Sequence, residues 1–120
     1  GKEFCNPEGA ELIVADMRKD LFLTTVVAPG STMLVRRWAV ERAGLFDEVH
    51  VHGEDWELWL RIAPFGLFAY LPEVLSQYRV YGWQKIVSVE ARDSWLHDLV
   101  KIVDTATSLW TANTSATGFS

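Results

Sequence analysis

Apolar side chains recur at helical spacing in four stretches of the chain. The clearest stretch, residues 54–63, opens with two acidic residues, which favour a helix N-terminus, and stops before Pro64 and Gly66. Its apolar side chains point to most sides, and this pattern predicts a buried helix. Further helices are predicted at residues 7–17, at 37–43 with Gly44 as the stop, and from residue 88 to about 110.

Shorter apolar runs, bounded by turn residues, predict extended segments. Residues 21–28 lead to a turn at Pro29–Gly30, and residues 32–35 follow as a short buried strand. Strands are also predicted at 67–71 and 75–81, antiparallel to each other around Pro72 and Glu73. The expected fold class is therefore α/β, with about three strands and four helices.

The chain is long enough for one domain, which we expect over residues 1–110. Residues 111–120 are small and polar, and they are expected to form a flexible tail. Of the 120 residues, 49% are apolar and 22% are charged, which is typical of a globular protein. The net charge of −5 and the scattered basic residues argue against nucleic acid as a partner. No apolar run approaches the roughly 20 residues of a membrane span.

The pair Glu54–Asp55 is the first candidate for chemistry. A carboxylate in the first turn of a helix has a fixed direction, and the neighbouring tryptophans would partly remove it from water. This combination suits a general base. The alternative is that both acids only stabilise the start of the helix.

Two histidines, His50 and His52, precede this pair and could bind a metal with a nearby carboxylate. Because the segment has the composition of a loop, two exposed histidines are the preferred interpretation. The residues Gly30, Ser31 and Thr32 do not form a phosphate cradle, since no helix start follows them. Most of the six tryptophans have helical spacing typical of a core, whereas Trp83 lies in a predicted loop.

Several motifs, taken in order, resemble the C-terminal half of a family 2 glycosyltransferase with the GT-A fold. They are PGSTMLVRR at 29–37, AGLFDE at 43–48, GEDWELWLRIA at 53–63, FAYLPE at 68–73 and YR at 78–79. The order and spacing match over roughly residues 20–82, and the pairing of the second and third motifs is the most specific part.

The resemblance implies that Asp55, next to Glu54, is the catalytic base of an inverting transfer from a nucleotide-sugar. It also implies that residues 29–35 form the floor of the sugar pocket. The substrate-binding residues that we expect are Ser31, Thr32, Asp47, Glu48, Tyr78, Arg79 and Trp83.

Two departures from the family pattern matter. A histidine that often follows the Tyr-Arg pair is replaced by Tyr81. The family's N-terminal half, which binds the nucleotide and supplies an Asp-x-Asp metal motif, has no counterpart in this sequence. We therefore expect no cofactor and no metal in this chain alone, and Mg²⁺ or Mn²⁺ only if another nucleotide-binding half completes the site.

Two hypotheses follow. The first is the acceptor half of a transferase that belongs to a longer enzyme or descends from one; it is inactive alone, and a separate chain could supply the missing half. Because the missing half would leave apolar surface and a strand edge uncovered, a homodimer is expected. The second is a stand-alone carbohydrate-binding or protein-interaction module that uses the same pocket. The family mostly works on the cytosolic side of membranes, so a cytoplasmic location is expected in either case.

Overall fold

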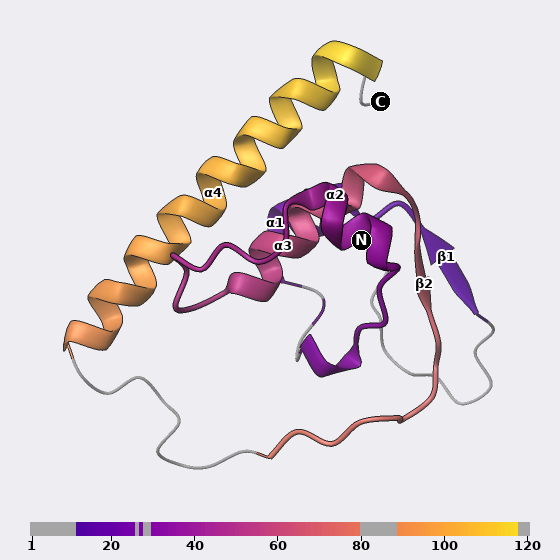
Figure 1. Ribbon diagram of the computed structural model, residues 1–120, viewed down its shortest axis with the longest axis horizontal. Helices are drawn as coiled ribbons and strands as arrows, with labels where there is room; N and C mark the ends of the chain where they lie inside the picture. The colour runs from indigo at the N-terminus through magenta and orange to yellow at the C-terminus, as the bar shows by residue number, and fades with distance from the viewer. Residues whose placement is uncertain (1–11, 26, 28–29, 80–88, 118–120) are drawn as a thin grey trace.

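The computed structural model describes residues 12–25, 27, 30–79 and 89–117. The elements follow in the order β1 (Ile13–Ala15), α1 (Arg18–Leu23), η1 (Gly30–Thr32), α2 (Arg37–Ala43), α3 (Glu54–Ile62), η2 (Ala63–Phe65), β2 (Phe68–Tyr70) and α4 (Val89–Thr117). Figure 1 shows α4 as one long helix, with the other elements gathered beside it. Over the described residues the fold is thus α-rich, with four α-helices and a two-stranded antiparallel sheet.

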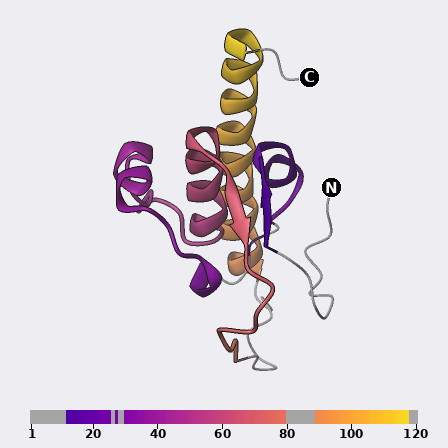
Figure 2. The same cartoon turned by 90° about the vertical axis from the view of Figure 1, so that its right-hand side faces the viewer.

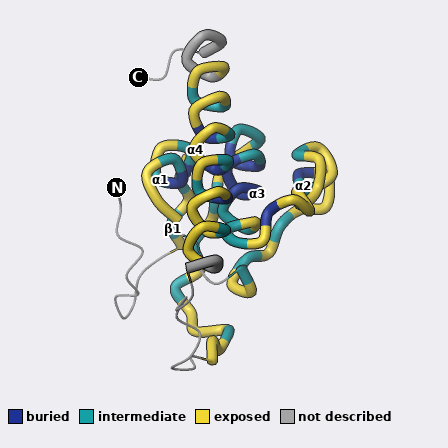
Figure 3. Tube along the Cα trace, turned by 90° about the vertical axis from the view of Figure 1, so that its left-hand side faces the viewer, coloured by how far each residue is buried: buried dark blue, intermediate teal, exposed yellow. Residues whose placement is uncertain are grey.

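Helix α3 is the centre of the packing, because it contacts α1, α2, α4 and η2. Five of its nine residues are buried, and Figure 3 shows this concentration of buried positions. The buried apolar core consists of Met17, Leu21, Ala39, Leu58, Trp59, Leu60, Ile62, Ala63, Ile102 and Ala106. The prediction of a buried helix that ends near Pro64 is confirmed.

The prediction of a helix at residues 7–17 is wrong in its described part, because residues 13–15 form strand β1. Ile13 pairs with Tyr70, and Ala15 pairs with Phe68, in an antiparallel ladder. Burial alternates from residue 12 to residue 17, so every second side chain faces the core, as in a strand. The pairing with β2, visible beside β1 in Figures 1 and 2, explains why these residues form a strand and not a helix. The remainder of the predicted helix, residues 7–11, lies outside the described residues.

Two predicted extended segments also differ in the structure. Of the segment 21–28, residues 21–23 belong instead to α1 (Arg18–Leu23), where Leu21 is fully buried and its N–H donates to the carbonyl of Met17 over 2.9 Å. Residues 32–35 were expected to be a strand, yet Gly30–Thr32 is a 3₁₀ turn and no ladder follows it in the part described. Met33 and Val35 point inward while Leu34 is 99% exposed, so the strand-like alternation is present without a pairing strand.

The prediction of a hairpin around Pro72 is wrong, although its first strand, β2, is confirmed. Residues 74–79 belong to no helix or strand, and residues 80 and 81 lie outside the described residues. β2 pairs with β1 instead. The observed sheet therefore has two strands in the part described, where three were expected.

The two other helix predictions are confirmed. Helix α2 ends at Gly44, whose φ of 91° is readily adopted by glycine, and its N–H bonds back to the carbonyls of Glu41 and Val40. Helix α4 begins one residue beyond Ser88 and continues to Thr117, through most of the segment expected to be a tail. Among the described residues, no helix is both long and apolar enough to cross a bilayer.

Candidate functional site

The start of α3 gives Asp55 a defined direction. Gly53 precedes the helix with a φ of 69°, and the Oδ1 atom of Asp55 accepts a hydrogen bond from the N–H of Trp56 over 2.7 Å. The indole Nε1 of Trp56 donates to the carbonyl of Leu21 over 2.7 Å. The first turn of α3 is thereby tied to α1.

Asp55 lines a pocket of about 180 Å³ between the start of α3 and helix α4. The residues around it are Thr25, His52, Gly53, Asp55, Trp56, Trp95, Leu99 and Ile102. One wall comes from the loop before α3 and its first turn, and the opposite wall comes from α4. The pocket is thus mostly apolar, with a carboxylate, an imidazole and a hydroxyl on its lining.

Within the segment predicted to form the pocket floor, the backbone of Gly30 lies against Asp55. A Cβ atom placed on Gly30 would lie 3.3 Å from the Oδ2 atom of Asp55, so η1 runs directly against this carboxylate. The neighbouring residues Ser31 and Thr32 are exposed and do not line the pocket. Glu54 is exposed as well, which leaves Asp55 as the acid of the pair that borders the pocket.

The other predicted substrate-binding residues do not line this pocket. Asp47 accepts a hydrogen bond from the N–H of Val49 over 3.0 Å, and Glu48 is exposed beside it. Tyr78 and Arg79 belong to the segment 74–79, which forms no helix or strand and lies away from α3 in Figures 1 and 2. Trp83 lies outside the described residues.

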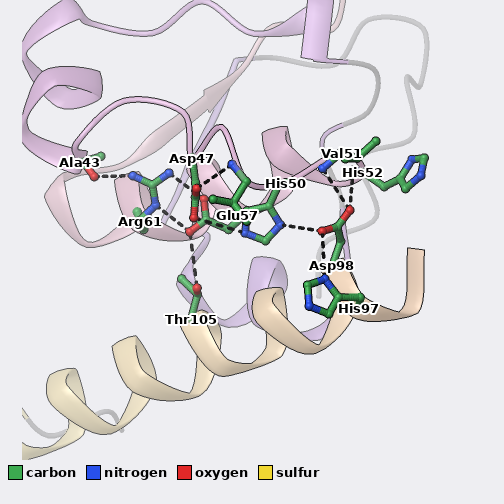
Figure 4. A network of polar contacts seen from close by, with 11 residues as sticks. Ala43, Asp47, His50, Val51, His52, Glu57, Arg61, His97, Asp98 and Thr105 are labelled. Atoms are coloured by element: carbon green, nitrogen blue, oxygen red, sulfur yellow. Dashed lines mark hydrogen bonds and ion pairs between the residues drawn. The ribbon is translucent and has the colours of Figure 1, made fainter. Parts of the chain in front are cut away.

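The histidine prediction needs correction, because His50 is 8% exposed and therefore buried. Its Nδ1 atom lies 3.7 Å from Oδ1 of Asp98, and its Nε2 atom lies 3.7 Å from Oδ2 of Asp47 (Figure 4). His52 is half-buried at the pocket. The loop was expected to be exposed because the sequence does not reveal that α4 packs over it.

Asp98 on α4 binds this loop through hydrogen bonds. It is 2% exposed, and its Oδ2 atom accepts hydrogen bonds from the N–H groups of Val51, over 3.1 Å, and His52, over 2.9 Å. Burial raises the pKa of Asp98, but these two N–H donors and the nearby charge of His50 and His52 outweigh it and hold the pKa below its usual value. Asp98 is therefore a charged, buried carboxylate.

A second buried acid, Glu57, helps to hold α3 in place. Arg61 binds both of its carboxylate oxygens, with Nε–Oε1 and Nη2–Oε2 distances of 2.8 and 2.6 Å, and also donates to the carbonyl of Ala43. The hydroxyl of Thr105 on α4 reaches Oε1 over 3.4 Å. Figure 4 shows this network beside the loop that holds His50. The spacing of four between Glu57 and Arg61 was the only sequence signal for it.

The described residues do not gather three or more metal-ligating side chains in one place. The donors near the pocket are a single carboxylate and a single imidazole. This set does not fit a resident divalent cation, which prefers several oxygen ligands.

Comparison with known proteins gave no match: no family model, no curated protein and no solved structure matches this chain.

Proposed function

We propose that this chain is the acceptor-side half of an inverting, family 2-like glycosyltransferase with a truncated GT-A fold, and that Asp55 is its catalytic base. The motif order in the sequence supports the family. The observation that carries the proposal is the position of Asp55 at the edge of a pocket between α3 and α4. A carboxylate placed only to stabilise a helix start would not need a pocket beside it.

In the proposed reaction, the carboxylate of Asp55 accepts the proton of an acceptor hydroxyl. The hydroxyl oxygen forms a bond to the anomeric carbon of the donor sugar, and the bond from that carbon to the nucleotide diphosphate breaks. The diphosphate leaves with the electron pair. Gly30 and the N–H of Trp56 fix the aim of Asp55, which is the geometric condition for a general base.

The pocket volume of about 180 Å³ is well above the roughly 10–15 Å³ that a cavity needs to hold one water molecule, so it has room for a small ligand. Trp56 and Trp95 offer aromatic surface to the apolar face of a ring, while Asp55, His52 and Thr25 offer hydrogen-bonding groups. This lining supports a carbohydrate as the ligand.

The proposal includes a partner that supplies the nucleotide-binding half. The described residues provide no group for the leaving diphosphate at the pocket, so the charge of the transition state would be unstabilised in this chain alone. Large apolar side chains are also uncovered, among them Leu34 at 99%, Val74 at 82% and Leu75 at 73% exposure. A second copy or a separate chain would cover them, and a cytoplasmic location follows from the same resemblance.

The test compares Asp55→Asn with Glu41→Gln in the full-length protein together with its nucleotide-binding half, mixed with nucleotide-sugars, Mn²⁺ and candidate acceptors. Asp55→Asn should lower turnover by at least 10²-fold, the order of a lost general base, while the fold stays intact. Glu41→Gln replaces an exposed acid outside the pocket and should leave turnover within a few fold. Retained turnover in Asp55→Asn would refute the assignment of the base.

A stand-alone carbohydrate-binding module is the second candidate, and the predominance of apolar and aromatic lining favours it. Such a module would bind sugars without a nucleotide or a metal. Titration of this chain with monosaccharides, followed by tryptophan fluorescence, distinguishes the two. Metal-independent binding that Trp95→Ala abolishes, with no transfer in the full-length protein, would favour the module.

A further inference from the structure

The carboxylate of Asp98 connects the two walls of the pocket. One of its oxygens accepts the N–H groups of two consecutive loop residues, Val51 and His52, while Asp98 itself belongs to α4. On that helix it lies between Trp95 and Leu99, both of which line the pocket. These hydrogen bonds therefore join the loop wall to the helix wall.

The loop leads from these hydrogen bonds directly to Asp55. Gly53 follows His52 with a φ of 69°, and a Cβ atom there would lie 2.7 Å from Cδ1 of Ile102 on α4. The backbone at Gly53 is thus pressed against α4, and α3 starts at the next residue. A change in the loop would move His52 and the first turn of α3 together.

Helix α3 has its own support, which is independent of Asp98. Leu58 and Ile62 are buried in the core, and the Glu57–Arg61 pair reaches Ala43 and Thr105. Loss of Asp98 would therefore leave α3 packed on α4 but release the loop in front of it. The cost of burying Asp98 is explained by the loop that it orders rather than by the packing of the helices.

We propose that Asp98 is a positioning residue, which fixes the loop of residues 50–53 and thereby the aim of Asp55 and His52 into the pocket. Its part in catalysis rests on the proposed function, whereas its part in ordering the pocket does not. The surrounding titratable groups are Asp47 and His52 on the loop side, His50 between the two acids, and His97 on α4, whose Nδ1 lies 4.0 Å from Oδ1 of Asp98.

The first experiment compares two variants by NMR. Asp98→Leu keeps the branching at Cγ and removes the acceptor, while Asp98→Asn keeps one oxygen that can accept both N–H groups. In Asp98→Leu, amide exchange at Val51 and His52 should become roughly ten- to hundredfold faster, and the resonances of Asp55 and Trp56 should shift. Asp98→Asn should restore all of these values toward the wild type, and Asp93→Ala, exposed on α4, should change none of them.

A second measurement needs no variant. On acidification of the wild-type protein, the amide proton shifts of Val51 and His52 should titrate together with the carboxyl carbon of Asp98. Amide shifts that stay constant through that titration would overturn the proposal, even if Asp98→Leu fails to fold.

In the full-length protein, Asp98→Leu should lower kcat by on the order of 10²-fold, and Asp98→Asn should recover most of it. Unchanged Asp55 resonances in Asp98→Leu, or unchanged turnover in an enzyme that Asp55→Asn inactivates, would overturn the positioning role. Failure of the proposed function is seen differently, as a wild-type protein without transfer activity or an active Asp55→Asn variant. In that case the NMR comparison still decides the role of Asp98.

Discussion

The backbone of Gly30 lies directly against the carboxylate of Asp55, such that a methyl group on Gly30 would be 3.3 Å from the Oδ2 atom. The two residues belong to different elements, η1 and α3, and are 25 positions apart in the sequence. Their contact brings residues 30–32, the GST part of the first motif, to the start of the GEDW helix. It thereby joins two of the motifs that carry the resemblance to glycosyltransferases.

The substitution Gly30→Ala tests this contact. The added methyl group should turn the Asp55 carboxylate away by a few tenths of an ångström and destabilise the protein by about 1 kcal/mol. Chemical denaturation measures the stability, and the carboxyl resonance of Asp55 measures the displacement. An unchanged Asp55 resonance in a folded Gly30→Ala variant would contradict the contact.

The substitution Gly53→Ala should be more damaging, by about 1–3 kcal/mol. Two causes add up: the φ of 69° is unfavourable for alanine, and the new Cβ would lie 2.7 Å from Cδ1 of Ile102. Gly66→Ala is the matched control, because Gly66 has an extended φ of 171° and no atom within 4 Å of the added Cβ. Equal stability losses in the two variants, measured by urea unfolding, would argue against the geometry of the loop.

The substitution Arg61→Ala leaves the buried carboxylate of Glu57 without its cationic partner. Since Glu57 is 3% exposed, we expect a loss of about 3–5 kcal/mol in the free energy of unfolding. Lys19→Ala, at an exposed position of α1, serves as the control and should change stability by less than about 0.5 kcal/mol. A double-mutant cycle with Glu57→Gln measures the coupling, and a coupling near zero would contradict the buried pair.

Acid should weaken the fold through Asp98. The N–H groups of His52 and Val51 and the nearby histidine charge, which outweigh burial, hold the pKa of Asp98 below its ordinary value of 3.8. The unfolded chain then takes up the proton first, so this stabilisation is present above about pH 3.8 and is lost as the pH falls through the folded-state pKa.

The measurement is thermal unfolding between about pH 2 and 6, where stability depends on the carboxylates. Asp98→Asn should have a flatter acid limb than the wild type. Asp16, whose pKa is lowered chiefly by its hydrogen bond to Arg18, supplies a separate part of the acid limb, so some slope should persist. A variant with an undiminished slope would show that Asp98 is not charged in the native state.

Local patterns were sufficient where an element carries its own start and stop signals. Helix α3 opens with acids and ends at a proline, α2 ends at Gly44, and α4 has a long apolar periodicity. Strand β2 was also predicted correctly. Local patterns failed at β1, α1 and the strand expected at 32–35, because short apolar runs fit either a helix or a strand until a partner is known.

The sequence by itself determined the central helix, its buried character and the acidic pair Glu54–Asp55 at its start, because periodicity and helix-terminal signals act over a few residues. Only the tertiary structure decided that α4 returns over the loop, that His50 is buried and that Asp98 holds the N–H groups of Val51 and His52. These contacts join positions more than 45 residues apart. Their energy comes from the removal of water between surfaces that meet only after the chain has folded.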